Sequence, residues 1–216
     1  MLLDTDQVES TMLEKTIMMT TQHPFLANME YIFQSDMRLY FVMPFIDGGE
    51  LYKVYIKEKR FPEYVVKFYA AQIVLGIGGL HDQGFMHRDM KLENIMLDSR
   101  GYLKLIDFGL AKLIGQQAMT LCGTAEYMSP EMTREVGHTY STDWWAVGIL
   151  IYEMLIGITP FFNKNRLKLF QRINNSKVKF PDRNVYQIEY SDEITDLVGK
   201  LLDKDPAKRL GTNGGA

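Results

Sequence analysis

The stretch that most constrains how this chain can fold is a run of polar residues on either side of a short hairpin pattern. Residues 87–94 read His-Arg-Asp-Met-Lys-Leu-Glu-Asn, and an Asp-Phe-Gly triplet occupies residues 107–109. Between them lie two short apolar segments, 94–97 and 102–106, separated by the turn signal Ser-Arg-Gly at 99–101. Such a pattern predicts two paired strands. Pairing would bring the start of the first strand next to the end of the second.

The residue types in this stretch suit the transfer of a phosphoryl group. Asp89 and Lys91 lie two positions apart, so a carboxylate and an ammonium group could face one reacting centre. Asn94 opens one predicted strand and Asp107 closes the next, which places two oxygen ligands side by side, as Mg²⁺ prefers. A proton acceptor, a lysine and a Mg²⁺ pair form a phosphoryl-transfer site. For any one of these residues a surface ion pair is the simpler explanation, but their joint spacing favours the site.

The rest of the chain predicts a small α/β part followed by a larger, mostly helical part, which is an α+β fold. Apolar residues at helical spacing predict a helix over residues 6–19. Segments 29–34 and 39–45 are rich in aromatic and β-branched residues and predict an antiparallel hairpin. Further helices are predicted over residues 62–82, 141–155, 167–173 and 192–202.

Composition excludes several classes of protein. The 216 residues are 46 % apolar and 24 % charged, which is ordinary for a globular protein and excludes a disordered chain. One cysteine, Cys122, excludes an internal disulfide framework and fits a reducing compartment, so we expect a cytoplasmic protein with possible access to the nucleus. The net charge of −3 gives no sign of nucleic-acid binding. The most apolar window, 144–158, is shorter than a membrane span and contains Glu153.

Taken together, the motifs resemble those of the eukaryotic protein kinases, and most closely the AGC group of serine/threonine kinases. The series in chain order is 87–94, 107–109, Ser129-Pro130-Glu131, Asp143-Trp144-Trp145 and Arg209. Residues 68–73 and 120–124 look like the AGC group in particular. The resemblance runs from about Gln7 to Leu210. It implies a two-lobe kinase fold, with a partial small lobe over 1–46, a hinge at 43–47 and a nearly complete helical lobe over 47–216.

The resemblance implies roles for the polar residues of the hairpin region. Asp89 would orient the substrate hydroxyl and accept its proton, and Lys91 would neutralise the transferring phosphoryl group. A lysine at this position suggests serine or threonine as the acceptor. Asn94 and Asp107 would hold Mg²⁺, so the implied activity is transfer of the γ-phosphate of Mg-ATP to protein serine or threonine.

Other residues are implied in nucleotide binding. Glu14, on the first predicted helix, would pair with a strand lysine that grips the ATP phosphates. Met43 and Phe45 would lie at the hinge beside adenine, and Met96 would form the floor of the pocket. Glu50 is assigned to the edge of the same site. A solvent-exposed helix face for Glu14, and plain core packing for the two methionines, are the alternative explanations.

A second implied site is a groove for the peptide substrate. Glu50, Glu93 and Glu153 would line it, and Thr124 is assigned to the same region. Because carboxylates pair with arginine in a bidentate manner, the implied substrates carry basic residues two or three places before the acceptor. Each carboxylate alone is more simply a surface group. Glu153, however, interrupts an apolar helix, where burial costs energy unless the carboxylate is paired or faces a cleft.

Regulation is implied by Thr120, which stands where AGC kinases carry an activating phosphothreonine. A phosphate there could pair with Arg88 and Lys112 and order the loop, so the resemblance implies an upstream activating kinase as a partner. The alternative is an ordinary loop threonine. Ser10 replaces a histidine that touches this phosphate in many AGC kinases, which puts the coupling of Thr120 to the first helix in doubt.

The sequence lacks two parts that kinases use to hold the ATP phosphates. No glycine precedes Gly48, and the first lysine, Lys15, already lies in the first predicted helix. A glycine-rich loop and a strand lysine are therefore absent, and we expect a kinase fragment that is weak or inactive alone. The alternative function is a kinase-derived binding or scaffold module. The intact set of Asp89, Lys91, Asn94 and Asp107 favours an enzyme, since a module without catalysis has no physical need for all four.

Overall fold

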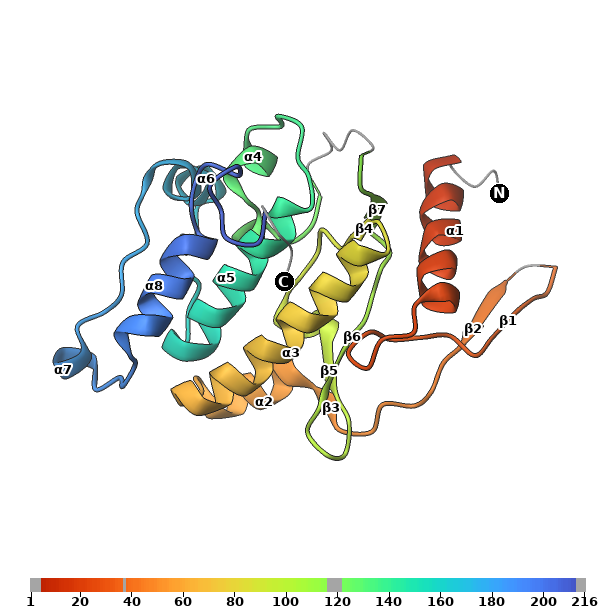
Figure 1. The fold of residues 1–216 in the computed structure, drawn as a ribbon, viewed down its shortest axis with the longest axis horizontal. Helices are drawn as coiled ribbons and strands as arrows, with labels where there is room; N and C mark the ends of the chain where they lie inside the picture. Colours follow the sequence, from red (N-terminus) through yellow and green to blue (C-terminus); the bar gives the residue numbers. More distant parts are fainter. Residues whose placement is uncertain (1–4, 37, 116–121, 213–216) are drawn as a thin grey trace.

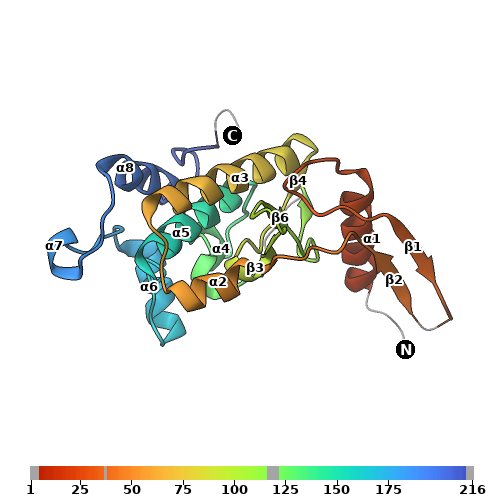
Figure 2. The same cartoon turned by 90° about the horizontal axis from the view of Figure 1, so that it is seen from below.

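The first part of the chain forms one helix and one hairpin. The computed structural model describes residues 5–36, 38–115 and 122–212. Helix α1 spans Thr5–Thr20, and strands β1 (Tyr31–Gln34) and β2 (Leu39–Val42) pair antiparallel, so the predicted helix and hairpin are confirmed. In Figure 1 and Figure 2 these elements lie at one end of the molecule, and α7 lies at the other.

A small three-stranded sheet lies between the polar residues singled out in the sequence, with Asn94 directly before one strand and Asp107 shortly after another. Strands β5 (Ile95–Leu97) and β6 (Leu103–Leu105) form the predicted hairpin, and β3 (Gly49–Glu50) pairs with the outer edge of β5. A Cβ atom at Gly48 would lie 2.5 Å from the carbonyl oxygens of Leu97 and Asp98, so only glycine fits this approach. A separate pair, β4 (Phe85–Met86) and β7 (Lys112–Leu113), closes the other end of the region.

The larger part is built of helices around α5 (Ser141–Ile156), whose residues 141–155 are all buried. Helix α3 (Glu63–Asp82) begins directly after Pro62 and packs against α5, as does α8 (Asp192–Leu201). The other helices are α2 (Leu51–Glu58), α4 (Pro130–Thr133), α6 (Arg166–Asn175) and α7 (Arg183–Tyr186), with 3₁₀ turns η1 (Leu92–Asn94) and η2 (Ala125–Tyr127).

The apolar content of α5 serves the core of the protein. Trp144 and Trp145 are 2 % and 0 % exposed, and Trp145 stacks on Phe161. Within the described ranges, no helix combines the length and the apolar composition needed to cross a membrane. Most of the apolar window at 144–158 is therefore a buried helix, as its length and charge predict, although α5 ends at Ile156 and Ile158 is exposed.

Candidate active site

The loop that carries Asp89 is fixed by a carboxylate on α5. The backbone N–H groups of His87 and Arg88 donate to Asp143 at 2.8 and 2.9 Å, and His81 Nε2 lies 2.8 Å from the same carboxylate. Burial acts to raise the pKa of Asp143, but hydrogen bonding and the charge of His81 outweigh it and hold the pKa below its ordinary value. An ionised Asp143 therefore anchors the loop from a helix more than fifty residues away.

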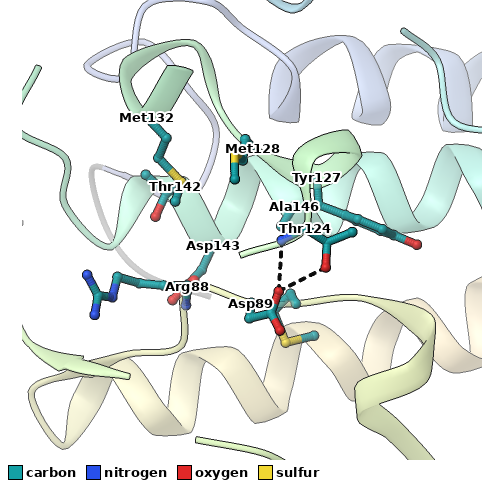
Figure 3. A pocket seen from close by; sticks show the side chains of 10 residues that line it. Arg88, Asp89, Thr124, Tyr127, Met128, Met132, Thr142, Asp143 and Ala146 are labelled. Atoms are coloured by element: carbon teal, nitrogen blue, oxygen red, sulfur yellow. Dashed lines mark hydrogen bonds between the residues drawn. The ribbon is translucent and has the colours of Figure 1, made fainter. Parts of the chain in front are cut away.

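Asp89 is buried and held by three neighbours. Its Oδ2 pairs with Lys91 Nζ at 2.6 Å and lies 3.3 Å from Asn94 Nδ2, which also donates to the Asp89 carbonyl. Its Oδ1 accepts hydrogen bonds from the Thr124 backbone N–H at 3.0 Å and from the Thr124 hydroxyl at 3.2 Å, as Figure 3 shows. Both carboxylate oxygens are thus oriented before any substrate arrives.

Asn94 and Asp107 lie at one end of the β5–β6 hairpin, as strand pairing predicts. The backbone N–H of Ile106 donates to the carbonyl of Asn94 at 3.0 Å. Asp107 has the left-handed backbone conformation (φ 64°), and its exposed carboxylate accepts from the N–H of Gly109 at 3.2 Å. One carboxylate and one amide oxygen fit the hard-oxygen coordination of Mg²⁺ when substrate phosphates complete it.

In the part of the chain that the structure describes, no group of three or more His, Cys, Asp or Glu side chains could hold an ion.

A pocket of about 560 Å³ lies between α1, the β1–β2 hairpin and the β5–β6 hairpin. The residues predicted for nucleotide binding that line it are Glu14, Met43, Phe45, Met96 and Asp107. Phe45 is 90 % exposed, so its ring is available to a ligand. Glu50 is not among the lining residues and instead forms an ion pair with Lys53 at 2.8 Å.

The Glu14 carboxylate lines this pocket near Asp107. Burial raises the pKa of Glu14, and the Asp107 charge raises it further, while a backbone hydrogen bond with Phe108 opposes both effects. Among the described residues Glu14 has no ion-pair partner within 4.0 Å. Two carboxylates that face one pocket favour a bound cation or cationic side chain between them.

The carboxylates predicted to bind the peptide do not all lie together. Glu153 is buried and accepts a hydrogen bond from the Tyr127 hydroxyl. Burial raises its pKa to about 7, and the charges of Glu93 and Glu126 contribute. Glu93 is exposed, and Glu126 accepts from the Thr159 hydroxyl at 2.7 Å. The structure therefore groups Glu93 and Glu153 with Glu126, which the sequence did not single out, whereas Glu50 pairs with Lys53.

The two cations of the predicted regulatory site lie near one another, close to Cys122. Burial raises the pKa of the Cys122 thiol, while Arg88 and Lys112 act to lower it. Arg88 Nε donates to the carbonyl of Leu110 at 2.6 Å, so its guanidinium contacts the segment directly after the Asp-Phe-Gly triplet. Thr120 itself lies outside the described residues.

Comparison with known proteins matches the protein kinase domain model to residues 3–214. The chain belongs to the protein kinase family. It is 42 % identical to cAMP-dependent protein kinase type 3 of Saccharomyces cerevisiae over 205 residues, and 42 % identical to the RAC serine/threonine-protein kinase of Drosophila melanogaster over 213 residues. It is also 44 % identical to Protein kinase 2 of Dictyostelium discoideum over 211 residues. The first two of these relatives are AGC-type kinases, which confirms the resemblance stated from the motifs.

The kinase segment covers nearly all of this chain but only part of each relative. The alignments take in 95 %, 97 % and 97 % of the chain, and 50 %, 34 % and 43 % of the three relatives. The chain therefore spans about half the length, or less, of these curated proteins.

Three contacts in this kinase site were not predicted from the sequence. Asp143 was noted as a motif residue, but its hydrogen bonds to the loop of Asp89 bridge 55 and 56 positions and leave no local signal. Thr124 was assigned to the peptide groove, and the structure shows it bonded to Asp89. Glu126 directly precedes Tyr127, which donates to Glu153, but this position in the sequence does not by itself predict that Glu126 lies near Glu153.

Proposed function

We propose that the protein to which this segment belongs is an ATP-dependent serine/threonine protein kinase that prefers acceptors preceded by basic residues. The observation that carries the proposal is the fixed geometry of Asp89, whose carboxylate is held by Lys91, Asn94 and Thr124. A preorganised carboxylate beside a lysine suits a reaction in which positioning and electrostatics supply most of the catalysis.

Each residue has a definite task in this mechanism. Mg-ATP, when bound, supplies the phosphoryl group, with Asn94 and Asp107 as the residues that would hold the metal. Asp89 orients the acceptor hydroxyl and takes up its proton as the oxygen–phosphorus bond forms and the bond to the leaving diphosphate breaks. Lys91 carries positive charge next to Asp89 and offsets the negative charge that spreads over the transferred group.

The basic-residue preference is supported by the carboxylates around Glu153. An arginine of the substrate would replace the Tyr127 hydroxyl, or add to it, as the partner of a carboxylate that burial otherwise makes costly to ionise. Glu93 is exposed beside it and would extend the same negative region. Glu50 would belong to this groove with its Lys53 partner displaced.

Regulation by phosphate and location in the cell are parts of the same proposal. A phosphate on Thr120, added by an upstream kinase, would find Arg88 and Lys112 in one region. A cytoplasmic protein, with access to the nucleus, fits a chain with one cysteine. Intact mass analysis after expression with and without a candidate activating kinase tests whether a phosphate is added to the chain.

The 216 residues alone are expected to be weak or inactive. No glycine precedes Gly48, and Lys15 is the first lysine, so this segment supplies neither a glycine-rich loop nor a strand lysine for the ATP phosphates. A kinase-derived binding module would share this inactivity. The two functions separate only in a protein expressed from the whole reading frame.

The experiment compares that protein with its Asp89→Asn variant on a serine peptide with arginines before the acceptor. We expect transfer of phosphate that needs Mg²⁺ and falls at least about a hundredfold in the variant. Asp36→Asn, an exposed turn position, is the matched control and should keep full activity. No transfer by the unaltered protein, or transfer that survives Asp89→Asn, would overturn the proposal. Replacing the arginines of the peptide by alanine tests the basic preference separately.

A further inference from the structure

An unusual concentration of positive charge lies in the second half of the chain. Residues 154–181 contain six lysines and arginines and no aspartate or glutamate, although the whole chain carries a net charge of −3. The six are Lys164, Arg166, Lys168, Arg172, Lys177 and Lys179, and we call them the α6 basic surface. They occupy helix α6 and the segments on either side of it.

All six side chains are exposed. In the parts of the chain that the structure describes, none of the six has a carboxylate within ion-pair distance. The internal contacts of the group are few. Arg166 stacks on the ring of Phe170, and Arg172 donates to the carbonyl of Phe162. The remaining four are lysines for which the structure gives no side-chain partner.

Two other cations nearby have a structural task, which makes the contrast clear. Lys204 Nζ donates to the carbonyl of Ile173 at 2.6 Å, and an Arg134 guanidinium nitrogen lies 3.4 Å from the carbonyl of Asn174. These bonds satisfy the last carbonyls of α6, where the helix dipole also favours positive charge. Lys204 and Arg134 therefore already bind the carbonyl groups at the end of α6, and the α6 basic surface is not needed to stabilise the helix end.

The arrangement of α6 leaves one apolar side chain within this positive field. Leu169 and Ile173 point into the core at 4 % and 0 % exposure, whereas Leu167 is 74 % exposed. Like charges held together on one surface repel one another and cost stability. An exposed leucine among cations that lack carboxylate partners suits a ligand of opposite charge with an apolar side chain at its centre.

We propose that the α6 basic surface, with Leu167, binds an acidic segment of a partner polypeptide that places an apolar side chain on Leu167. The positive charge of the surface favours an acidic ligand. Because salt screens charges over a short distance, a peptide bound at this surface is little affected by the acidic residues elsewhere on the chain. Membranes and nucleic acids are larger polyanions that would also meet the acidic remainder of the chain.

Two further observations disfavour those larger ligands. The apolar face of α6 is buried through Leu169 and Ile173, so the helix has no free face to insert into a bilayer. Phe161 and Phe170 are buried or half-buried, so within the described part of this surface no freely exposed ring offers a base a stacking platform.

The position of the surface gives docking a use, and this step alone rests on the proposed function. Helix α6 packs against α4, which follows directly on the segment that carries Thr124 and Tyr127 (Figure 1). A partner held on α6 would keep its acceptor near Asp89 at high effective concentration. Docking of this kind adds affinity without any change in the chemistry.

The binding test does not depend on catalysis. The probe is a fluorescein-labelled peptide of alternating glutamate and leucine, and its control has glutamine in place of glutamate. Anisotropy should show binding of the acidic probe at low salt that weakens steeply as salt is raised, and much weaker binding of the control. The triple variant Lys164→Glu, Lys168→Glu, Lys177→Glu should bind at least about tenfold more weakly.

A matched variant separates this surface from net charge. Lys57→Glu, Lys200→Glu, Lys208→Glu changes the same number of exposed lysines elsewhere and should bind within about twofold of the unaltered chain. Leu167→Ser should weaken binding of the acidic probe while leaving thermal stability unchanged. Equal losses in both triple variants, no binding of the acidic probe, or tighter binding of phosphatidylserine vesicles or single-stranded DNA than of the peptide would each overturn the proposal.

Discussion

Arg209 and Glu131 form a two-pronged ion pair inside the helical part, with nitrogen–oxygen distances of 2.6 and 2.9 Å. Their side chains are 0 % and 5 % exposed, and the same guanidinium also donates to the carbonyl of Ser141 at 2.8 Å. Burial acts to raise the pKa of Glu131, but the hydrogen bonds and charge of Arg209 outweigh it and hold the pKa below its ordinary value. The pair thereby ties α4 to the segment after α8.

Removing one partner of this pair should be costly. Arg209→Ala leaves the Glu131 carboxylate buried without its cation, and we expect the free energy of unfolding to fall by about 3–5 kcal/mol. Urea denaturation measures the change. Lys208→Ala, whose side chain is 75 % exposed, is the neighbouring control and should stay within about 0.5 kcal/mol of the unaltered chain. A loss of under about 1 kcal/mol in Arg209→Ala would contradict this account.

Glu153 should make stability depend on pH. Its pKa is raised to about 7 by burial, with Glu93 and Glu126 adding to the effect, whereas in the unfolded chain it lies near the ordinary 4.5. The folded state therefore binds the proton more tightly, and this contribution is present below the unfolded pKa and lost as pH rises through about 7. We expect a loss of about 2–3 kcal/mol between about pH 5 and about pH 8.

Glu153→Gln isolates that contribution, because glutamine can still accept a hydrogen bond from Tyr127 but does not titrate. The difference in unfolding free energy between the two proteins should change by about 2–3 kcal/mol between about pH 5 and about pH 8. A constant difference across the range would show that the carboxyl titrates normally. Binding of an arginine peptide to the unaltered chain should strengthen over the same interval, since arginine pairs with the ionised form.

Asp143→Asn should loosen the loop that carries Asp89. The amide keeps one oxygen, so it cannot accept from His81 and from both backbone N–H groups as the carboxylate does. We expect the amides of His87 and Arg88 to exchange hydrogen at least about tenfold faster, with a fall in stability of about 3 kcal/mol. Asp196→Asn, an exposed ion-pair position on α8, is the control for both readouts. Unchanged exchange in Asp143→Asn would sink the idea.

The sequence predicted those parts of the fold whose signals are local. Helix α3 begins where Pro62 permits it to begin, and the length of α5 follows its apolar run. The β5–β6 hairpin was predicted from its turn and placed Asn94 near Asp107 correctly. The two-residue strands β4 and β7 are too short to show a period, and their pairing was not predicted.

The contacts that orient the site depend on chain packing over long separations. Thr124 reaches Asp89 across 35 positions, and nothing in its neighbours distinguishes it from a residue that contacts substrate. Glu126 acts on Glu153 because η2 packs against α5, a relationship fixed by tertiary structure. Glu50, in contrast, has a local partner. It forms an ion pair with Lys53, which lies three residues away on the adjoining helix α2.

Gly123 should be needed to keep Thr124 on Asp89. Its φ is +86°, and a Cβ atom there would lie 2.7 Å from the carbonyl oxygen of Arg88. Gly123→Ala must therefore shift the backbone and weaken both hydrogen bonds that Thr124 donates, at a cost of about 1–3 kcal/mol in stability. Gly137→Ala is the matched control, because a Cβ atom there meets nothing within 4 Å. In the protein expressed from the whole reading frame, Gly123→Ala should lose activity well beyond its loss of stability, and equal activity in the two variants would show that Thr124 does not position Asp89.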